Sequence, residues 1–229
     1  KAGVEGELLP GLALRPASLS RLTPVSPRGR PWKSTRIYDS SKPLGVKIQG
    51  MNMDKERFWE LIKESHQASK GDPRKQAKYV TKELARLGES EILAYQAILD
   101  DLIDDAYIAE LWDIAGIMAG GWGCSEDGFT DFRAWLIGQG KNVFEKALVD
   151  PESLVEIVAV GQETQSEALL YVAVNAYELS TGKDADSMPK RAKSIPELGG
   201  VILKDEDLLF AEYPKATEKF WNWWIDRNR

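Results

Sequence analysis

The sequence has few of the residues that build thiol and metal chemistry. Among its 229 residues there is one cysteine, Cys124, and one histidine, His66. A single cysteine excludes an internal disulfide, which fits a reducing cytoplasm, and this pair cannot supply the four ligands of a usual zinc site. No apolar run approaches the roughly 20 residues that a membrane-spanning helix needs. We therefore expect a cytoplasmic protein with no membrane partner.

Charge is distributed unevenly along the chain. Residues 1–50 contain nine Lys and Arg against three Asp and Glu, whereas residues 51–229 contain 21 Lys and Arg against 33 Asp and Glu. The second segment therefore carries a net charge of −12, within an overall charge of −6. Because so acidic a surface repels phosphate backbones, we do not expect nucleic acid as a partner.

Residues 1–50 also differ from the rest in composition. They hold six prolines and six serines with no sustained hydrophobic period, which is typical of a linker or a disordered segment. The first methionine is Met51. We interpret residues 1–50 as a disordered or non-native N-terminal extension and residues 51–229 as the folded domain. A basic targeting or binding arm is the alternative interpretation.

This interpretation makes a prediction about stability. A chain shortened to begin at Met51 should unfold at the same temperature as the full chain, because the preceding segment cannot bury enough apolar surface to contribute to folding. Thermal denaturation followed by circular dichroism measures this. A fall of many degrees in the shortened chain would mean that residues 1–50 pack on the domain.

From Asp54 onward the hydrophobic spacing is helical. Apolar residues recur every three or four positions, and N-cap residues or glycines such as Asp72, Gly88 and Ser125 separate the segments. The pattern predicts an all-α fold, a single compact multi-helix domain of about six to eight helices. Helices are expected near 54–69, 73–87, 90–106, 109–118, 125–139, 141–149, 164–181 and 214–229, with a loop over 181–200 and a short strand or buried coil at 201–203.

The stretch GGWGCSEDGFTDFRAWLIGQG, residues 120–140, joins a glycine-rich turn to an unusually aromatic helix. Further recognisable positions are Asp54, Phe58, Trp59, Tyr107, Trp112, Asp113, Phe144, Glu145 and the segment 150–154. Together these residues resemble a bacterial family called domain of unknown function 4240, over roughly residues 53–182. The resemblance implies a small, mostly helical intracellular domain, and it brings no assigned catalytic residues or cofactor.

Arg133 lies on the apolar side of this aromatic helix, among Phe129, Leu136 and Ile137. A buried guanidinium needs a partner, because an unpaired buried charge is very costly. We expect a structural, bidentate ion pair that fixes this helix against one of the two preceding helices. The candidate carboxylates are Asp100, Asp101, Asp104, Asp105 and Asp113. The functional alternative is that Arg133 holds a ligand's carboxylate or phosphate.

The aspartate row is the sharpest chemical pattern in the chain. It comprises Asp100, Asp101, Asp104 and Asp105. The row is similar to the Asp-Asp-x-x-Asp motif that holds magnesium and diphosphate in prenyl-transferring enzymes, and three of its carboxylates would share one helix face. The other interpretations are a solvated acidic face and a carboxylate partner for a nearby cation.

The glycine-rich turn and Cys124 resemble functional motifs, but each lacks residues that the motif needs. The glycine-rich turn precedes a helix as a phosphate-binding loop does, but it lacks the lysine of a P-loop and is followed by acidic residues that oppose an anion. Cys124 could act as a nucleophile only if His66 packed beside it, and we expect His66 to be exposed. We therefore predict no catalytic residue and no cofactor from these patterns.

The sequence as a whole favours a non-enzymatic binding or regulatory module over an enzyme. Its binding surface would be an aromatic and acidic rim, with an unknown protein or small molecule as partner. The candidate binding residues are Trp112, Trp122, Asp127, Asp131 and Arg133. The alternative is a metal-dependent hydrolase or transferase that uses the aspartate row.

Overall fold

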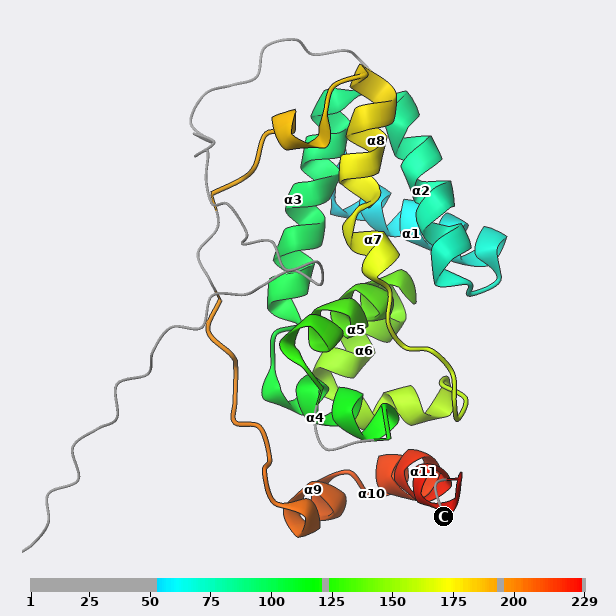
Figure 1. The fold of residues 1–229 in the computed structure, drawn as a ribbon, viewed down its shortest axis with the longest axis vertical. Coiled ribbons are helices and arrows are strands. Elements are labelled where there is room, and N and C mark those ends of the chain that lie inside the picture. The colour runs from blue at the N-terminus through cyan, green and yellow to red at the C-terminus, as the bar shows by residue number, and fades with distance from the viewer. Residues whose placement is uncertain (1–52, 121–123, 193–195, 228–229) are drawn as a thin grey trace, which may run out of the picture. The chain divides into compact units, whose positions relative to one another are not determined.

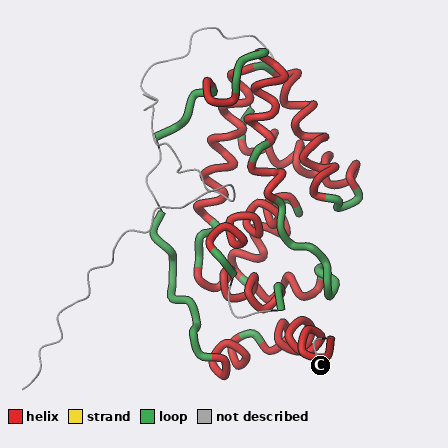
Figure 2. Tube along the Cα trace, in the orientation of Figure 1, coloured by secondary structure: helices red, strands yellow, loops and turns green. Residues whose placement is uncertain are grey.

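The chain is described by a computed structural model over residues 53–120, 124–192 and 196–227. These residues belong to one compact unit and are predominantly helical, as the sequence predicts (Figure 1, Figure 2). Within the described ranges no β-strand forms, and an isolated parallel bridge joins Ile108 to Gly199. The α-helices are α1 Lys55–Ser69, α2 Pro73–Leu87, α3 Glu89–Asp105, α4 Ala109–Met118, α5 Glu126–Gly138, α6 Lys141–Val149, α7 Glu167–Leu170, α8 Val172–Thr181, α9 Glu206–Glu212, α10 Pro214–Ala216 and α11 Asn222–Arg227. Shorter turns are η1 Pro151–Glu156, η2 Ala185–Ser187 and η3 Thr217–Trp221, of which η3 is π-helical.

The predicted helix starts are confirmed by their caps. The side chains of Asp54, Asp72 and Ser125 each accept a hydrogen bond from the backbone N–H three residues later, at 2.8, 3.0 and 3.0 Å. Each bond satisfies one of the N–H groups that a helix leaves unpaired at its start. Gly88 separates α2 from α3 with a φ of 93°, a conformation that favours glycine.

The core forms where α1, α2 and α3 pack against α5 and where α8 packs on α2 and α3. The helix α8, yellow in Figure 1, runs alongside both α2 and α3. A buried amide fixes this packing, because Gln76 of α2 donates from Nε2 to the carbonyl of Gly138 at the end of α5, at 2.8 Å. The largest side chains buried there are Phe58, Tyr95, Phe129, Phe132, Trp135 and Tyr177.

The C-terminal third departs from the prediction. The expected helix 164–181 is two helices, α7 and α8, with Tyr171 between them. Residues 201–203 are coil rather than strand, and Val201 is 82 % exposed. Helix α9 was not predicted, although Asp205 caps it by accepting from the N–H of Leu208 at 3.0 Å. The described residues therefore contain more, shorter helices than the six to eight predicted.

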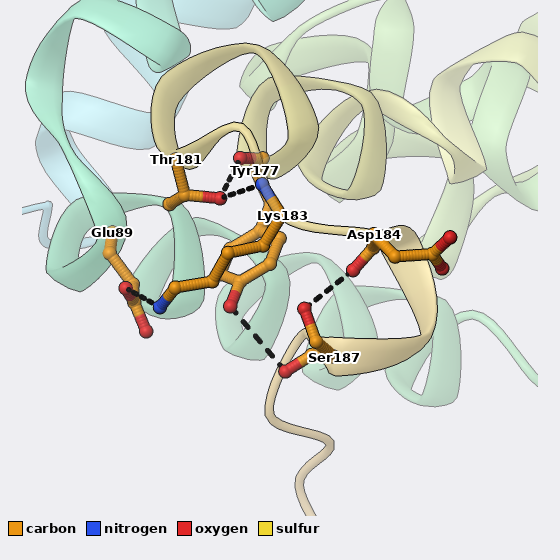
Figure 3. Close-up of polar contacts among 6 residues, drawn as sticks. All are labelled: Glu89, Tyr177, Thr181, Lys183, Asp184 and Ser187. Atoms are coloured by element: carbon orange, nitrogen blue, oxygen red, sulfur yellow. Dashed lines mark hydrogen bonds and ion pairs between the residues drawn. The ribbon is translucent and has the colours of Figure 1, made fainter.

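A polar network ties the end of α8 to the start of α3 (Figure 3). Lys183 forms an ion pair with Glu89 at 3.2 Å and lies 5.6 Å from the ring centroid of Tyr177. The hydroxyl of Tyr177 donates to the carbonyl of Ser187 at 3.4 Å, and that of Thr181 donates to the carbonyl of Tyr177 at 2.7 Å. Because these groups satisfy one another, we assign the network a structural role.

Candidate functional site

Arg133 is buried, as predicted, with 5 % of its surface exposed. Its partners differ from the prediction. Nη1 donates to the carbonyl of Ile103 at 2.7 Å, and Nη2 donates to the hydroxyl of Thr130 at 2.9 Å. Among the described residues no carboxylate forms an ion pair with it, so the predicted bidentate pair is wrong.

The contact with Ile103 explains this choice of partner. Ile103 lies in the last turn of α3, where carbonyl groups have no partner within the helix and the helix dipole is negative. The guanidinium therefore caps the C-terminus of α3 and joins α5 to it. Burial lowers the pKa of Arg133, while Tyr107, Asp104 and Glu126 oppose that shift. The predicted structural role, fixing α5 against α3, agrees with this geometry.

Two aromatic rings enclose the guanidinium. Its Cζ atom lies 4.7 Å from the ring centroid of Tyr107 and 4.8 Å from that of Phe129. Trp112 stacks on the other side of this cluster, with its ring centroid 4.5 Å from that of Phe129. Its indole N–H donates to the carbonyl of Cys124 at 2.8 Å, so Trp112 holds the residue that precedes the N-cap of α5. Trp112 is half-buried; Trp122 lies outside the described residues.

Three carboxylates lie near the first turns of α5, close enough to influence one another electrostatically. They are Asp127 and Asp131 on α5 and Glu167 on α7, and we call them the acidic corner. The carbonyl of Asp131 accepts from the N–H of Ser166 at 3.0 Å, which brings the start of α7 to this place. Burial, then Glu167 and Asp127, raise the pKa of Asp131 to about 6. Within the part of the chain that the structure describes, none of the three forms an ion pair.

Cys124 borders the acidic corner but is poorly suited to nucleophilic chemistry. Burial, and then the charge of Asp131, raise the pKa of its thiol, whereas a reactive cysteine needs a lowered pKa. The thiol packs against Gly128, where a Cβ would stand 2.9 Å from Sγ. His66 lies on α1 with its ring beside Gly71, and it is half-buried rather than exposed as predicted.

The aspartate row does not converge on a common site. Asp101 forms an ion pair with Arg191 at 2.6 Å, and Asp100 accepts from the amide of Gln96 at 2.9 Å. Asp105 is exposed. Across the described ranges, no group of three His, Cys, Asp or Glu side chains is arranged to hold a metal ion. The ion pair of Asp101 agrees with the interpretation that the row provides a carboxylate partner for a nearby cation.

A comparison with protein families shows to which family the chain belongs. A family model described as "Protein of unknown function (DUF4240)" matches residues 53–179, which include Arg133, the aromatic rings around it and the acidic corner. The chain belongs to the DUF4240 family. No curated protein and no solved structure matches it. Among the described residues of this DUF4240 protein, no helix is both long enough and apolar enough to cross a bilayer.

The family match separates two parts of the described chain. The DUF4240 domain, residues 53–179, contains α1 to α7 and most of α8. Residues 196–227, with α9 to α11, lie beyond it but contact its helix α4 and turn η1. Of the acidic corner, sequence reasoning found Asp127 and Asp131 and missed Glu167. No sequence pattern places Glu167 beside Asp127 and Asp131, because Glu167 lies on α7 and the two aspartates lie on α5.

Proposed function

We propose that this DUF4240 protein is a non-enzymatic binding module that holds a basic segment of a partner protein in the acidic corner. The observation that carries the proposal is the proximity of Asp127, Asp131 and Glu167, none of which forms an ion pair with a Lys or Arg of the described residues. Burial, and then repulsion from Glu167 and Asp127, raise the pKa of Asp131 to about 6. An arriving Lys or Arg side chain would relieve this repulsion and restore the charged form.

The groups around the acidic corner also favour a binding role. Trp112 and Cys124 form an apolar border beside the carboxylates, against which the carbon stem of Lys or Arg can pack. Aromatic side chains such as Trp112 are enriched in recognition surfaces.

The environments of Arg133 and Cys124, two side chains that can take part in catalysis in other proteins, support binding rather than catalysis here. The guanidinium of Arg133 is enclosed by rings and backbone, and burial raises the pKa of the Cys124 thiol. We also propose a cytoplasmic location, which suits an exposed acidic site beside a reduced thiol. Nucleic acid and anionic membranes are excluded from the proposal, because the acidic corner repels both.

Binding of a short oligo-arginine peptide tests the proposal. The double variant Asp127→Asn/Asp131→Asn should bind the labelled peptide roughly 2- to 30-fold more weakly than the unaltered protein, because each exposed ion pair contributes roughly 0.2–1 kcal/mol. Fluorescence anisotropy at low and moderate ionic strength measures the dissociation constant. Added salt should weaken binding to the unaltered protein more than binding to the variant.

A matched control separates a local site from general attraction. The variant Asp105→Asn/Asp186→Asn removes the same number of charges from exposed positions on α3 and η2. It should bind the peptide as the unaltered protein does. If both double variants lose affinity equally, the peptide is attracted by net charge alone and the acidic corner is not the binding site.

A further inference from the structure

The segment that follows the DUF4240 domain is fastened back onto it. At its start, the N–H of Gly199 donates to the carbonyl of Tyr107 at 3.0 Å, and the carbonyl of Gly199 accepts from the N–H of Ala109 at 2.7 Å. These two bonds form the parallel bridge at the beginning of α4. Gly200 continues along α4, where a Cβ would stand 3.2 Å from a carboxylate oxygen of Glu110. We call residues 199–227 the strap.

A buried carboxylate receives the next part of the strap. Asp113 of α4 is 5 % exposed, and both of its oxygens face the N–H of Leu203, at 3.2 and 3.4 Å. No Lys or Arg among the described residues forms an ion pair with Asp113. A single neutral donor is weak compensation for a buried negative charge.

The far end of the strap is seated by aromatic side chains and by a second carboxylate. Trp224 lies so close to Gly120 that a Cβ there would stand 2.1 Å from its ring, and Trp223 covers Gly161. Glu152 of η1 accepts from the N–H groups of Lys215 and Ala216, at 2.7 and 3.0 Å, and so caps the helical end of the strap. The strap therefore contacts the DUF4240 domain at both ends, and Asp113 lies between them.

We propose that the strap is a regulatory element, which covers the face of α4 and η1 and is held less tightly, as one unit, when Asp113 is ionised. The covered face includes Gly120, the last described residue before the segment that leads to Cys124 and the acidic corner. Release of the strap uncovers this face, and protonation of Asp113 strengthens the docking that covers it. This regulation by the strap does not depend on which partner binds the acidic corner.

The electrostatics around Asp113 determine whether docking of the strap strengthens or weakens as the pH changes. Burial, opposed by the bond from Leu203 and assisted by the charge of Glu110, raises the pKa of Asp113 to about 6 from an ordinary value of 3.8. The docked state therefore binds the proton more tightly than the released state, so docking strengthens as the pH falls through about 6 and weakens as it rises. Tyr213, on the strap, also faces these groups. Burial and the charges of Asp113, Glu110, Glu212 and Glu152 raise its pKa, so it stays neutral throughout this range.

Hydrogen exchange of the full chain, followed by mass spectrometry at about pH 7.5 and about pH 5.5, tests the proposal. After correction for intrinsic rates, peptides from 199–227 should be about 4-fold better protected at the lower pH, the ratio expected for pKa values of about 6 and 3.8. Peptides from α1 to α3 should show no such change. In Asp113→Asn the strap should be equally protected at both pH values.

Two further variants keep the test decisive. Trp224→Ala should lower protection of the whole strap at both pH values and preserve the 4-fold ratio, because the indole does not titrate. Glu110→Gln should reduce the ratio, because it removes a charge that raises the pKa of Asp113. Strap protection that is independent of pH, or that rises equally in Asp113→Asn, would overturn the proposal.

Discussion

Replacing Phe129 with alanine is expected to lower the free energy of unfolding by about 3–5 kcal/mol, the range for a large aromatic residue removed from a packed core. Phe129 is fully buried and is the ring that Trp112, Tyr107 and Phe132 all contact, at centroid distances of 4.5, 6.1 and 6.2 Å. Its loss also opens one face of the Arg133 guanidinium, so the effect should lie toward the upper end of that range.

Urea denaturation followed by circular dichroism measures the change. Leu179→Ala provides the control, because Leu179 is 67 % exposed and its truncation should stay within about 0.5 kcal/mol of the unaltered protein. A cost below about 1 kcal/mol for Phe129→Ala would mean that the aromatic cluster is not a packed core.

Arg133→Met is expected to cost about 2 kcal/mol. Methionine keeps the apolar stem, but it leaves the carbonyl of Ile103 without its 2.7 Å donor, and a buried unsatisfied carbonyl costs about 1–3 kcal/mol. Loss of the cation–π contacts adds to this, while removal of a buried charge offsets part of it. The earlier expectation of an ion pair would have predicted about 3–5 kcal/mol.

The pH dependence distinguishes these two accounts. The hydrogen-bond partners of Arg133 are two carbonyls and a hydroxyl, which do not titrate, and Asp104 and Glu126 act on it only through their charge. The cost of Arg133→Met should therefore fall only slightly between about pH 8 and about pH 4. A cost that shrinks strongly at the lower pH would indicate that a carboxylate forms an ion pair with the guanidinium. Urea denaturation at the two pH values provides the comparison.

Helix starts, some helix bounds and the burial of Arg133 could be predicted from neighbouring residues in the sequence. The starts at Asp54, Asp72 and Ser125 were predictable because an N-cap acts on N–H groups only a few residues away. The bounds of α4 and α6 were also predicted as observed, since their apolar spacing is strong. The burial of Arg133 followed from its apolar neighbours in the same helix.

Features that depend on tertiary packing were not predictable in this way. Charge matching alone suggests an aspartate as partner for Arg133, but the geometry offers a free carbonyl at the end of α3. Similarly, Asp113 faces the N–H of Leu203, 90 residues away. The acidic corner needs α7 to return to α5, which is set by the contact between Ser166 and Asp131. None of these long-range pairings has a periodic signature.

The ionisation of Asp131 tests the central claim most directly. Carbon-detected NMR of the side-chain carboxyl groups can follow its titration in the free protein and in the presence of the oligo-arginine peptide. In the free protein the pKa should be about 6, and bound peptide should lower it toward the ordinary value of 3.8, because a nearby cation favours the carboxylate. A saturating peptide that leaves the titration of Asp131 unchanged would contradict the assignment of the acidic corner as the binding site.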